Sequence, residues 1–307
     1  MLTRRQALAA PIAATLLAAP FAAAAAPPFR VAYAGSMGAL MDKGIGPAFA
    51  AETHLTYQGI GRGAFALARL IAAKQLVADV FIPITAGPFA IVRKAGLAHD
   101  AIPVASTQMC LPYSPKSPHA KAFAAAAADK LSWPELLSRP GIRFGRTDPR
   151  TDPQGRNILF TMKLAELFYH RPGFAAKLLG PAINPAQIFT EPSLLARLEA
   201  GQIDVASGYL SAVHSQGLPF IPLPPQINLG DATMAATWYD RARMAVPGPH
   251  GDVTATPQPL MFYAMTLTDA PDAAAAQRFL RFLTGPKGKA LFARFGYSPP
   301  SGPVLGA

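Results

Sequence analysis

Two kinds of hydrophobic pattern follow one another along the chain. Residues 29–34 alternate and are rich in β-forming side chains, which predicts a strand. Apolar runs at 78–82 and 261–267 predict two more strands, and residues 64–74 repeat apolar side chains at helical spacing. Strands that alternate with helices of about 10 to 15 residues are typical of a parallel α/β sheet.

A second α/β unit is predicted further along. Its expected elements are a strand at 141–145, a helix at 157–169, a helix at 192–200 that ends at Gly201, and a strand at 204–210. The glycine-rich segment 59–63 is expected to be a turn, and the proline-dense segment 218–228 a connection. Two helices, at 273–283 and 287–295, close the chain.

Composition limits the classes of protein to consider. The length of 307 residues suggests about two domains, and 51% hydrophobic against 15% charged residues excludes a disordered chain. Cys110 is the only cysteine, so intrachain disulfides, cysteine-based zinc sites and iron–sulfur clusters are excluded. No cofactor-binding signature is present, because Walker, H-E-x-x-H and G-x-G-x-x-G motifs are all missing.

The first 26 residues have the pattern of a signal peptide. Arg4 and Arg5 precede a short apolar run and a series of alanines, an arrangement that is too short to span a bilayer. The paired arginines favour twin-arginine export, with an ordinary secretory signal as the alternative. A periplasmic location without a lipid anchor is therefore expected. Removal of this segment lowers the formal charge from +11 to +9, which suits small anions better than nucleic acid in an exported protein.

Three segments share one design: a strand, a small polar or glycine-rich turn, and the start of a helix. They are Gly35-Ser36, Arg62-Gly63 and the run from Asp152 to Gly155. Such a start presents unpaired N–H groups and the positive end of the helix dipole to an anion. Ser36 adds a hydroxyl donor and Arg62 a forked cation. Most turns of this kind serve only as helix caps, and Asp152 is a candidate for that role too.

Hydrolysis is the competing chemistry. Residues 34–38 approach the G-x-S-x-G nucleophile elbow, but the first glycine is missing and no histidine stands in a triad context. An enzyme is therefore not expected, although a secreted hydrolase built on the same scaffold stays open as an alternative.

Several of these motifs occur in a characteristic order. They are Ala34-Gly35-Ser36, Ala78-Asp79-Val80, Asp152-Pro153-x-Gly155, Leu198-Glu199-Ala200-Gly201-x-x-Asp204, Tyr209 and Ile227-Asn228-Leu229-Gly230. In this order the chain resembles the periplasmic molybdate/tungstate-binding proteins of ABC importers, in particular their tungstate-type branch. The resemblance extends over essentially the whole chain after residue 26.

The resemblance implies a two-lobed α/β fold of the type II periplasmic binding proteins, with the ligand between lobes joined by two crossing segments. The expected lobes are 27–108 with 228–307, and 109–227, with the crossings near 109–113 and 223–228. It also implies a monomer that delivers a small oxyanion to a membrane permease, without a cofactor. The expected ligand-binding residues are Gly35, Ser36, Arg62, Gly63, Asp152, Gly155, Glu199 and Tyr209, with Asp152 and Glu199 approaching the metal centre of the bound oxyanion.

Two features complicate this assignment. Two carboxylates beside a dianion repel it, so Asp152 and Glu199 fit only if they coordinate a high-valent metal or if a cation offsets them. Where the family has a second serine, this chain has Arg62, which either compensates the carboxylates or binds a different anion directly. Sulfate-like and small organic anions therefore stay open as alternative ligands.

Overall fold

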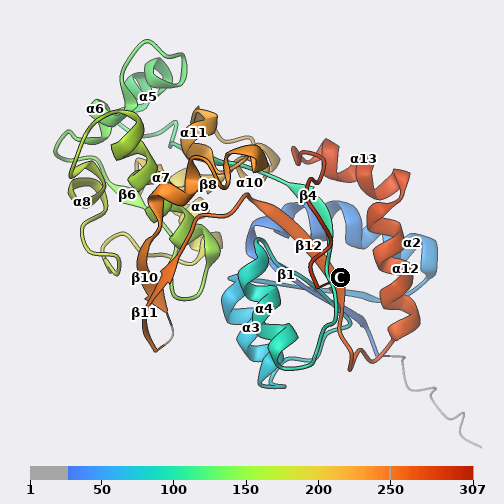
Figure 1. Cartoon of the computed structure of the whole chain (residues 1–307). Coiled ribbons are helices and arrows are strands. Elements are labelled where there is room, and N and C mark those ends of the chain that lie inside the picture. Colours follow the sequence, from blue (N-terminus) through green and yellow to red (C-terminus); the bar gives the residue numbers. More distant parts are fainter. Residues whose placement is uncertain (1–26, 249, 307) are drawn as a thin grey trace, which may run out of the picture.

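The computed structural model describes residues 27–248 and 250–306, and the expected signal peptide lies outside this part of the chain. The described elements form two lobes, each built around its own sheet (Figure 1). This arrangement confirms the predicted two-lobed α/β architecture.

The first lobe contains a five-stranded sheet in the order β2-β1-β3-β12-β4. Its strands are β1 (Phe29–Ala34), β2 (Tyr57–Arg62), β3 (Val80–Ile82), β4 (Ile102–Ser106) and β12 (Met261–Thr266). Strand β1 pairs in parallel with β2 and β3, whereas β12 runs antiparallel between β3 and β4.

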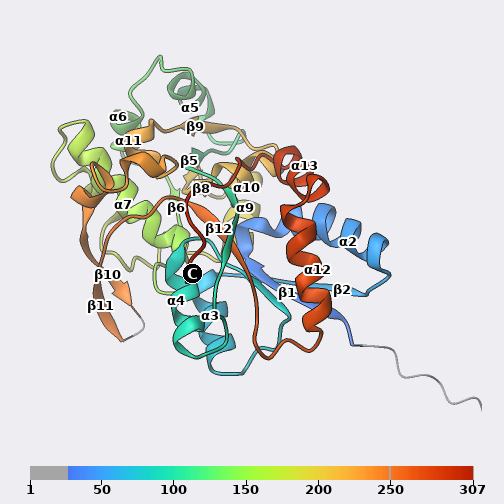
Figure 2. The same ribbon diagram turned by 45° about the vertical axis from the view of Figure 1, so that its right-hand side comes forward.

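Helices cover both faces of this sheet. They are α2 (Gly46–Thr53), α3 (Ala64–Ala72), α4 (Ala86–Lys94), α12 (Ala273–Thr284) and α13 (Pro286–Arg294). Figures 1 and 2 show α3 and α4 on one side of β1 and α2 and α12 on the other. The expected helix after β1 is irregular, with a 3-10 turn η1 (Gly35–Met37), a short α1 (Gly38–Leu40) and a π-helical turn η2 (Met41–Ile45) before α2.

The second lobe contains a three-stranded sheet and a two-stranded parallel pair. The sheet has β5 (Met109–Pro112) between β8 (Gly208–Tyr209) and β9 (Phe220–Pro222), and the pair is β6 (Phe144–Gly145) with β7 (Val205–Ala206). The surrounding helices are α5 (Ala120–Ala127), α6 (Trp133–Leu137), α7 (Pro153–Phe168), α8 (Phe174–Leu179), α9 (Glu191–Ala200), α10 (Leu210–Ser215) and α11 (Pro225–Asn228). Two 3-10 turns, η3 (Ala232–Met234) and η4 (Tyr239–Ala242), and the hairpin β10 (Met244–Gly248) with β11 (Gly251–Ala255) follow.

The chain crosses between the lobes twice. It passes from β4 to β5 through residues 107–108 and returns from β11 to β12 through residues 256–260. Because α11 and η4 pack against α7, the segment after residue 228 first contacts the second lobe. The first sheet is rejoined at Met261, and the expected lobe boundary at 228 stays a prediction.

Two of the expected local structures are wrong. Residues 59–62 are not a turn but part of β2, where the ring of Tyr33 lies so close that a Cβ at Gly61 would come within 2.7 Å of it. The glycines therefore let a strand pack on an aromatic ring. Residues 218–228 contain β9 and α11, so this proline-dense segment is structured rather than a bare connection. Cys110 is buried in β5.

Candidate functional site

A cavity of about 560 Å³ lies where the two lobes meet. The first lobe contributes Gly35, Arg62 and Gly63 to its wall, and the second lobe contributes Asp152 and Glu191. The lobes are in direct contact beside it, since the Ala66 N–H donates to the Thr151 carbonyl at 3.2 Å. The structure therefore shows a closed cleft.

The first lobe brings the turn after β1 to this cavity. Ser36 lies in η1 and is buried, and its hydroxyl oxygen has no hydrogen-bond partner in the part of the chain that the structure describes. The backbone of Gly35 approaches the second lobe so closely that a Cβ there would lie 2.9 Å from Oε2 of Glu191. Glycine at this position thus lets a carboxyl group from the opposite lobe reach the turn.

The second lobe brings three carboxyl groups to the same cavity: Asp148 is half-buried and paired with Arg150, whereas Asp152 and Glu191 are buried. Asp152 is the N-cap of α7, and its Oδ1 accepts a hydrogen bond from the Gln154 N–H at 2.9 Å. Glu191 is the first residue of α9, and its Oε1 has no hydrogen-bond partner among the described residues. Asp152 thus fills the capping role that the sequence left open, and it lines the cavity as well.

Burial without a neutralising cation changes the acidity of this pair. Burial raises the pKa of Asp152 to about 6, and burial together with the charge of Asp152 raises the pKa of Glu191 well above its ordinary value. Within the described residues, no lysine or arginine forms an ion pair with either carboxyl group. The pair therefore retains protons at pH values where exposed carboxyl groups are ionised.

A buried tyrosine lies beneath the two carboxyl groups. The Tyr209 hydroxyl accepts a hydrogen bond from Nδ2 of Asn157 at 2.9 Å, and its pKa is raised by burial and by the nearby charge of Asp152. Tyr297, from the C-terminal segment of the first lobe, donates to the Ser36 carbonyl at 3.2 Å. These phenols stay neutral and orient the polar groups around the cleft.

Several buried polar atoms in or next to the walls of this cavity have no hydrogen-bond partner within the described residues. They include Oγ of Ser36, Oγ1 of Thr147, Oε1 of Gln154 and Oε1 of Glu191, all buried. Nearly all buried polar groups in folded proteins are hydrogen-bonded, and exceptions often mark the place of a ligand or water. The cleft is therefore equipped to hold a polar ligand with groups from both lobes.

Most of the predicted site residues lie in or next to the cavity. Gly35, Arg62, Gly63 and Asp152 line the cavity, and Ser36 and Tyr209 are buried beside it. Gly155 lies behind the wall, where a Cβ would come within 2.4 Å of the Thr147 carbonyl oxygen. Its role is to let the first turn of α7 pack on the preceding loop.

Glu199 lies elsewhere. It is exposed in the last turn of α9, eight residues and about 12 Å along the helix from Glu191. The acidic partner of Asp152 in the cavity is Glu191, which the sequence interpretation missed, as it missed Thr147 and Tyr297. The available signal was Thr190-Glu191-Pro192, since proline directly after Glu191 marks the start of a helix.

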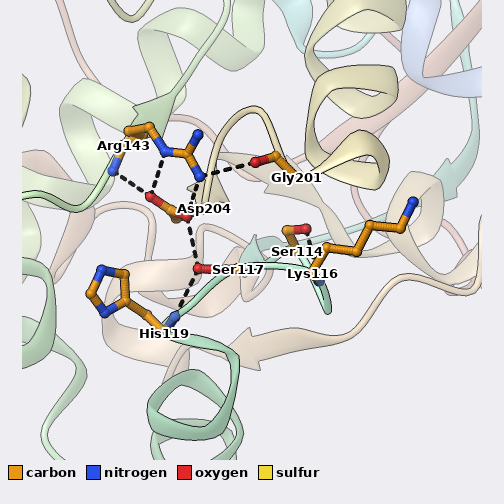
Figure 3. Close-up of polar contacts among 7 residues, drawn as sticks. All are labelled: Ser114, Lys116, Ser117, His119, Arg143, Gly201 and Asp204. Carbon is orange, nitrogen blue, oxygen red and sulfur yellow. Dashed lines mark hydrogen bonds and ion pairs between the residues drawn. The ribbon is translucent and has the colours of Figure 1, made fainter.

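The motif that contains Glu199 has a structural explanation. Gly201 ends α9 in the left-handed conformation, with φ of 78°, and its carbonyl accepts from Nη2 of Arg143 at 2.9 Å. Asp204 accepts from Nη2 and Nε of the same arginine at 2.7 and 2.9 Å and from the Ser117 hydroxyl at 2.7 Å (Figure 3). This network anchors the end of α9 to β6 and β7.

Arg62 stands at the end of β2, exposed at the rim of the cavity. Within the described part of the chain it makes no ion pair or side-chain hydrogen bond, so it does not neutralise Asp152 or Glu191 in this closed form. Its guanidinium group is available to a ligand.

Two kinds of feature are absent from residues 27–248 and 250–306. No helix there has the length and apolar composition needed to cross a bilayer. No group of three or more His, Cys, Asp and Glu side chains there is arranged to hold a metal ion.

Comparison with known proteins shows which sequences this chain is similar to. Residues 29–298 match the model of the bacterial extracellular solute-binding proteins. An uncharacterized solute-binding protein of Petrotoga mobilis is 35% identical over 56% of this chain and 54% of its own. A molybdate/tungstate-binding protein of Pyrococcus abyssi is 30% identical over 52% of this chain and 51% of its own. The chain thus spans about half the length of the curated relatives it matches.

Among solved structures, the periplasmic molybdate-binding protein of Azotobacter vinelandii superimposes with a TM-score of 0.62 at 14% identity. The match covers 89% of this chain and all of the other. It confirms the type II binding-protein fold.

Proposed function

Because the chain belongs to the bacterial extracellular solute-binding proteins, we propose that it is the binding component of an ABC importer for molybdate or tungstate. The relative from Pyrococcus abyssi, which carries this specificity in its name, supports the proposal. The protein would be exported to the periplasm, bind one oxyanion as a monomer, and deliver it to a membrane permease.

The observation that carries this proposal is the buried pair of Asp152 and Glu191 in the second lobe, opposite the Gly35-Ser36 turn of the first lobe, whose Gly35 lies against the Glu191 carboxyl group. Carboxylates repel an anion whose surface consists only of oxygen atoms. A molybdenum or tungsten centre can instead take carboxylate oxygens as ligands while its own oxygens accept hydrogen bonds. Sulfate and phosphate offer no such centre, so the pair favours a metal oxyanion.

Each residue then has a defined role. The Ser36 hydroxyl, unpartnered in the closed cleft, donates to one oxygen of the anion. Asp152 and Glu191 release their protons and ligate the metal centre. Closure of the lobes removes water from these groups and strengthens each contact.

Titration calorimetry with tungstate, molybdate, sulfate, thiosulfate and phosphate tests the proposal. Tungstate and molybdate are expected to bind much more tightly than the other three, and native mass spectrometry should find one oxyanion per chain. The absence of heat and thermal shift with all five anions would sink the proposal.

Arg62 supports a second candidate ligand, a sulfate-like or small organic anion. Its unpaired guanidinium group lies at the rim of a cavity that also has the apolar wall Ile188, Phe189 and Pro192. This candidate predicts that Arg62→Ser abolishes binding of such an anion and improves binding of tungstate. The opposite result, loss of tungstate binding alone, favours the first candidate.

Binding rather than catalysis is proposed because no histidine lines the cavity in the described part of the chain, so Ser36 has no evident base there. Esterase or phosphatase activity that disappears in Ser36→Ala would overturn this part of the proposal.

A further inference from the structure

A second cavity, of about 330 Å³, lies between the lobes on another face of α7. The first lobe contributes Phe65 from α3 and Thr85 and Gly87 from the start of α4. The second lobe contributes Arg156 and Phe160 from α7. None of the residues that line the first cavity lines this one.

Arg156 carries an unneutralised charge into this space. It is half-buried, and its guanidinium carbon lies 4.1 Å from the ring centre of Phe65 in the opposite lobe. Its Nε and Nη2 donate to the carbonyls of Pro149 and Pro247, at 2.9 and 3.2 Å, and no carboxylate pairs with it in the described residues. Nη1 is left without a protein partner, so the cavity contains a cation with donors to spare.

Thr85 adds a second, independent feature. Only 7% of this residue is exposed, it lines the cavity, and its hydroxyl has no hydrogen-bond partner in the described part of the chain. It is also the N-cap residue of the nine-residue helix α4 without capping it through its side chain. Thr85, Gly87 at the start of α4 and Arg156 therefore line the same space.

The remaining walls define what kind of anion fits. Phe65, Pro153, Phe160 and Ala255 are apolar, and Asn157 and Gln258 provide side-chain amides. Arg156 is the only titratable residue among the lining residues. A bare inorganic anion would leave most of the volume and the aromatic walls uncovered, whereas an organic body would bury them.

We propose that this cavity is a separate binding site for a small organic carboxylate, held by Arg156 and Thr85. The carboxylate accepts hydrogen bonds from Nη1 of Arg156 in the second lobe and from the Thr85 hydroxyl in the first. The apolar body lies against Phe65 and Phe160. Because its contacts come from both lobes, the bound carboxylate stabilises the closed form.

Calorimetry and thermal shift with sodium benzoate and sodium butyrate test this site, with sulfate and phosphate at equal ionic strength for comparison. Benzoate is expected to bind the wild-type protein, and to bind it at least as tightly when tungstate is already present, because both ligands stabilise the closed form. Arg156→Gln is expected to weaken benzoate binding about tenfold or more, since a charge-assisted contact is lost. Arg69→Gln is the matched control, because Arg69 is a neighbouring interlobe arginine that donates to the Arg150 carbonyl and does not line the cavity.

Thr85→Gly separates binding from folding. Thr85 has φ of 65° and ψ of 163°, a conformation that only glycine adopts without strain, so this variant should melt at a higher temperature than the wild type. It should nevertheless bind benzoate more weakly, because the hydroxyl is gone. A purely structural role for Thr85 would not move the two readouts in opposite directions.

Three results would overturn the site. The first is the absence of heat and thermal shift with both carboxylates in the wild-type protein. The second is competition between benzoate and tungstate for one site. The third is binding of sulfate or phosphate as tight as that of benzoate, which would remove the organic class. The first and third readouts do not depend on whether tungstate is the ligand of the first cavity, so failure of this site can be distinguished from failure of the proposed function.

Discussion

Two buried carboxyl clusters of the second lobe differ in how completely they are paired. Asp204 is 1% exposed, while Asp152 and Glu191 are each 7% exposed. Asp204 accepts hydrogen bonds from the backbone and side chain of Arg143 and from Ser117 (Figure 3). Asp152 has its cap contact to Gln154, and Glu191 has an oxygen without any partner.

The same burial therefore has opposite consequences for acidity. At Asp204, burial alone would raise the pKa, but the hydrogen bonds and charge of Arg143 outweigh it and lower the pKa to about 2. At Asp152, burial dominates and raises the pKa to about 6. A buried carboxylate whose partners are all supplied by the protein stabilises the fold, whereas a pair left without partners is available to a ligand.

The largest effect on stability is expected when the hydrogen-bond network of Asp204 with Arg143 and Ser117 is broken. Asp204→Ala should lower the free energy of unfolding by about 3 kcal/mol, because Ser117 and Arg143 lose a buried partner. Urea unfolding measures the change. Glu52→Ala is the control, since its ion pair with Lys287 is exposed and should contribute less than about 1 kcal/mol. Equal losses in the two variants would contradict the assigned role of Asp204.

Removal of the ionisable group of Glu191, in the pair with Asp152, should affect ligand binding rather than folding. Glu191→Gln is expected to weaken tungstate binding about 10- to 100-fold, since a ligand group is lost. The stability of the ligand-free protein should change little, because burial raises the pKa of Glu191 and glutamine has nearly the shape of the protonated side chain. Calorimetry measures the first effect and urea unfolding the second.

Glu199→Gln is the matched control for this prediction. It makes the same chemical change in the same helix, but at an exposed position outside the cavity. Tungstate binding as in the wild type is expected. A loss of affinity in Glu199→Gln without one in Glu191→Gln would restore the assignment made from the sequence.

The two clusters should respond to pH in opposite directions. The folded-state pKa of Asp152 is raised, so its contribution to stability is present at low pH and is lost as the pH rises through about 6. The free energy of unfolding of the ligand-free protein should therefore fall by about 1 kcal/mol between pH 5 and 7. The pKa of Asp204 is lowered, so its contribution is lost as the pH falls from about 4 toward 2.

Urea unfolding across this pH range checks both directions. The double variant Asp152→Asn, Glu191→Gln should remove the fall between pH 5 and 7 and keep the acid limb. Tungstate affinity should increase over the same interval, because the pair must release protons to act as ligands. An affinity that decreases with pH would show that the protonated carboxyl groups donate hydrogen bonds instead.

The smallest effect is expected at Ser36. Ser36→Ala removes one neutral hydrogen-bond donor, so tungstate affinity should fall about 3- to 10-fold. Ser138→Ala is a suitable control, because the Ser138 hydroxyl donates to the Pro134 carbonyl in the same lobe as α7, away from the cavity. Unchanged affinity in Ser36→Ala would mean that the unpartnered hydroxyl does not contact the ligand.

Local patterns predicted the regular elements well. The strand at 29–34 has the expected bounds, and the helices α3 and α12 lie where the apolar spacing indicated. The glycines of residues 59–63 were misread because their role depends on Tyr33, whose ring packs against them from the neighbouring strand. The sequence of residues 59–63 by itself gives no indication of that contact.

The candidate site was predicted only in part, because some of its residues have local sequence signals and others depend on contacts between distant residues. Asp152 and Ser36 stand at strand-to-helix turns, which the sequence marks by local signals. The motif 198–204, which resembles the family pattern, favours Glu199 as a ligand residue, although its Gly201 and Asp204 accept hydrogen bonds from Arg143 in a structural network. Glu191 carries no local sign of burial, since Gly35, the residue that its carboxyl group approaches, lies in the other lobe.

The sequence by itself determined the α/β class, the main strand and helix positions and the resemblance to oxyanion-binding proteins, because these depend on periodicity and motif order. Only the tertiary structure decided which carboxyl groups are buried together. Burial and acidity depend on contacts between residues far apart in the chain. The lobe that carries Gly35 closes over Asp152 and Glu191, whereas Arg143 forms an ion pair with Asp204 and with neither of the other two carboxyl groups.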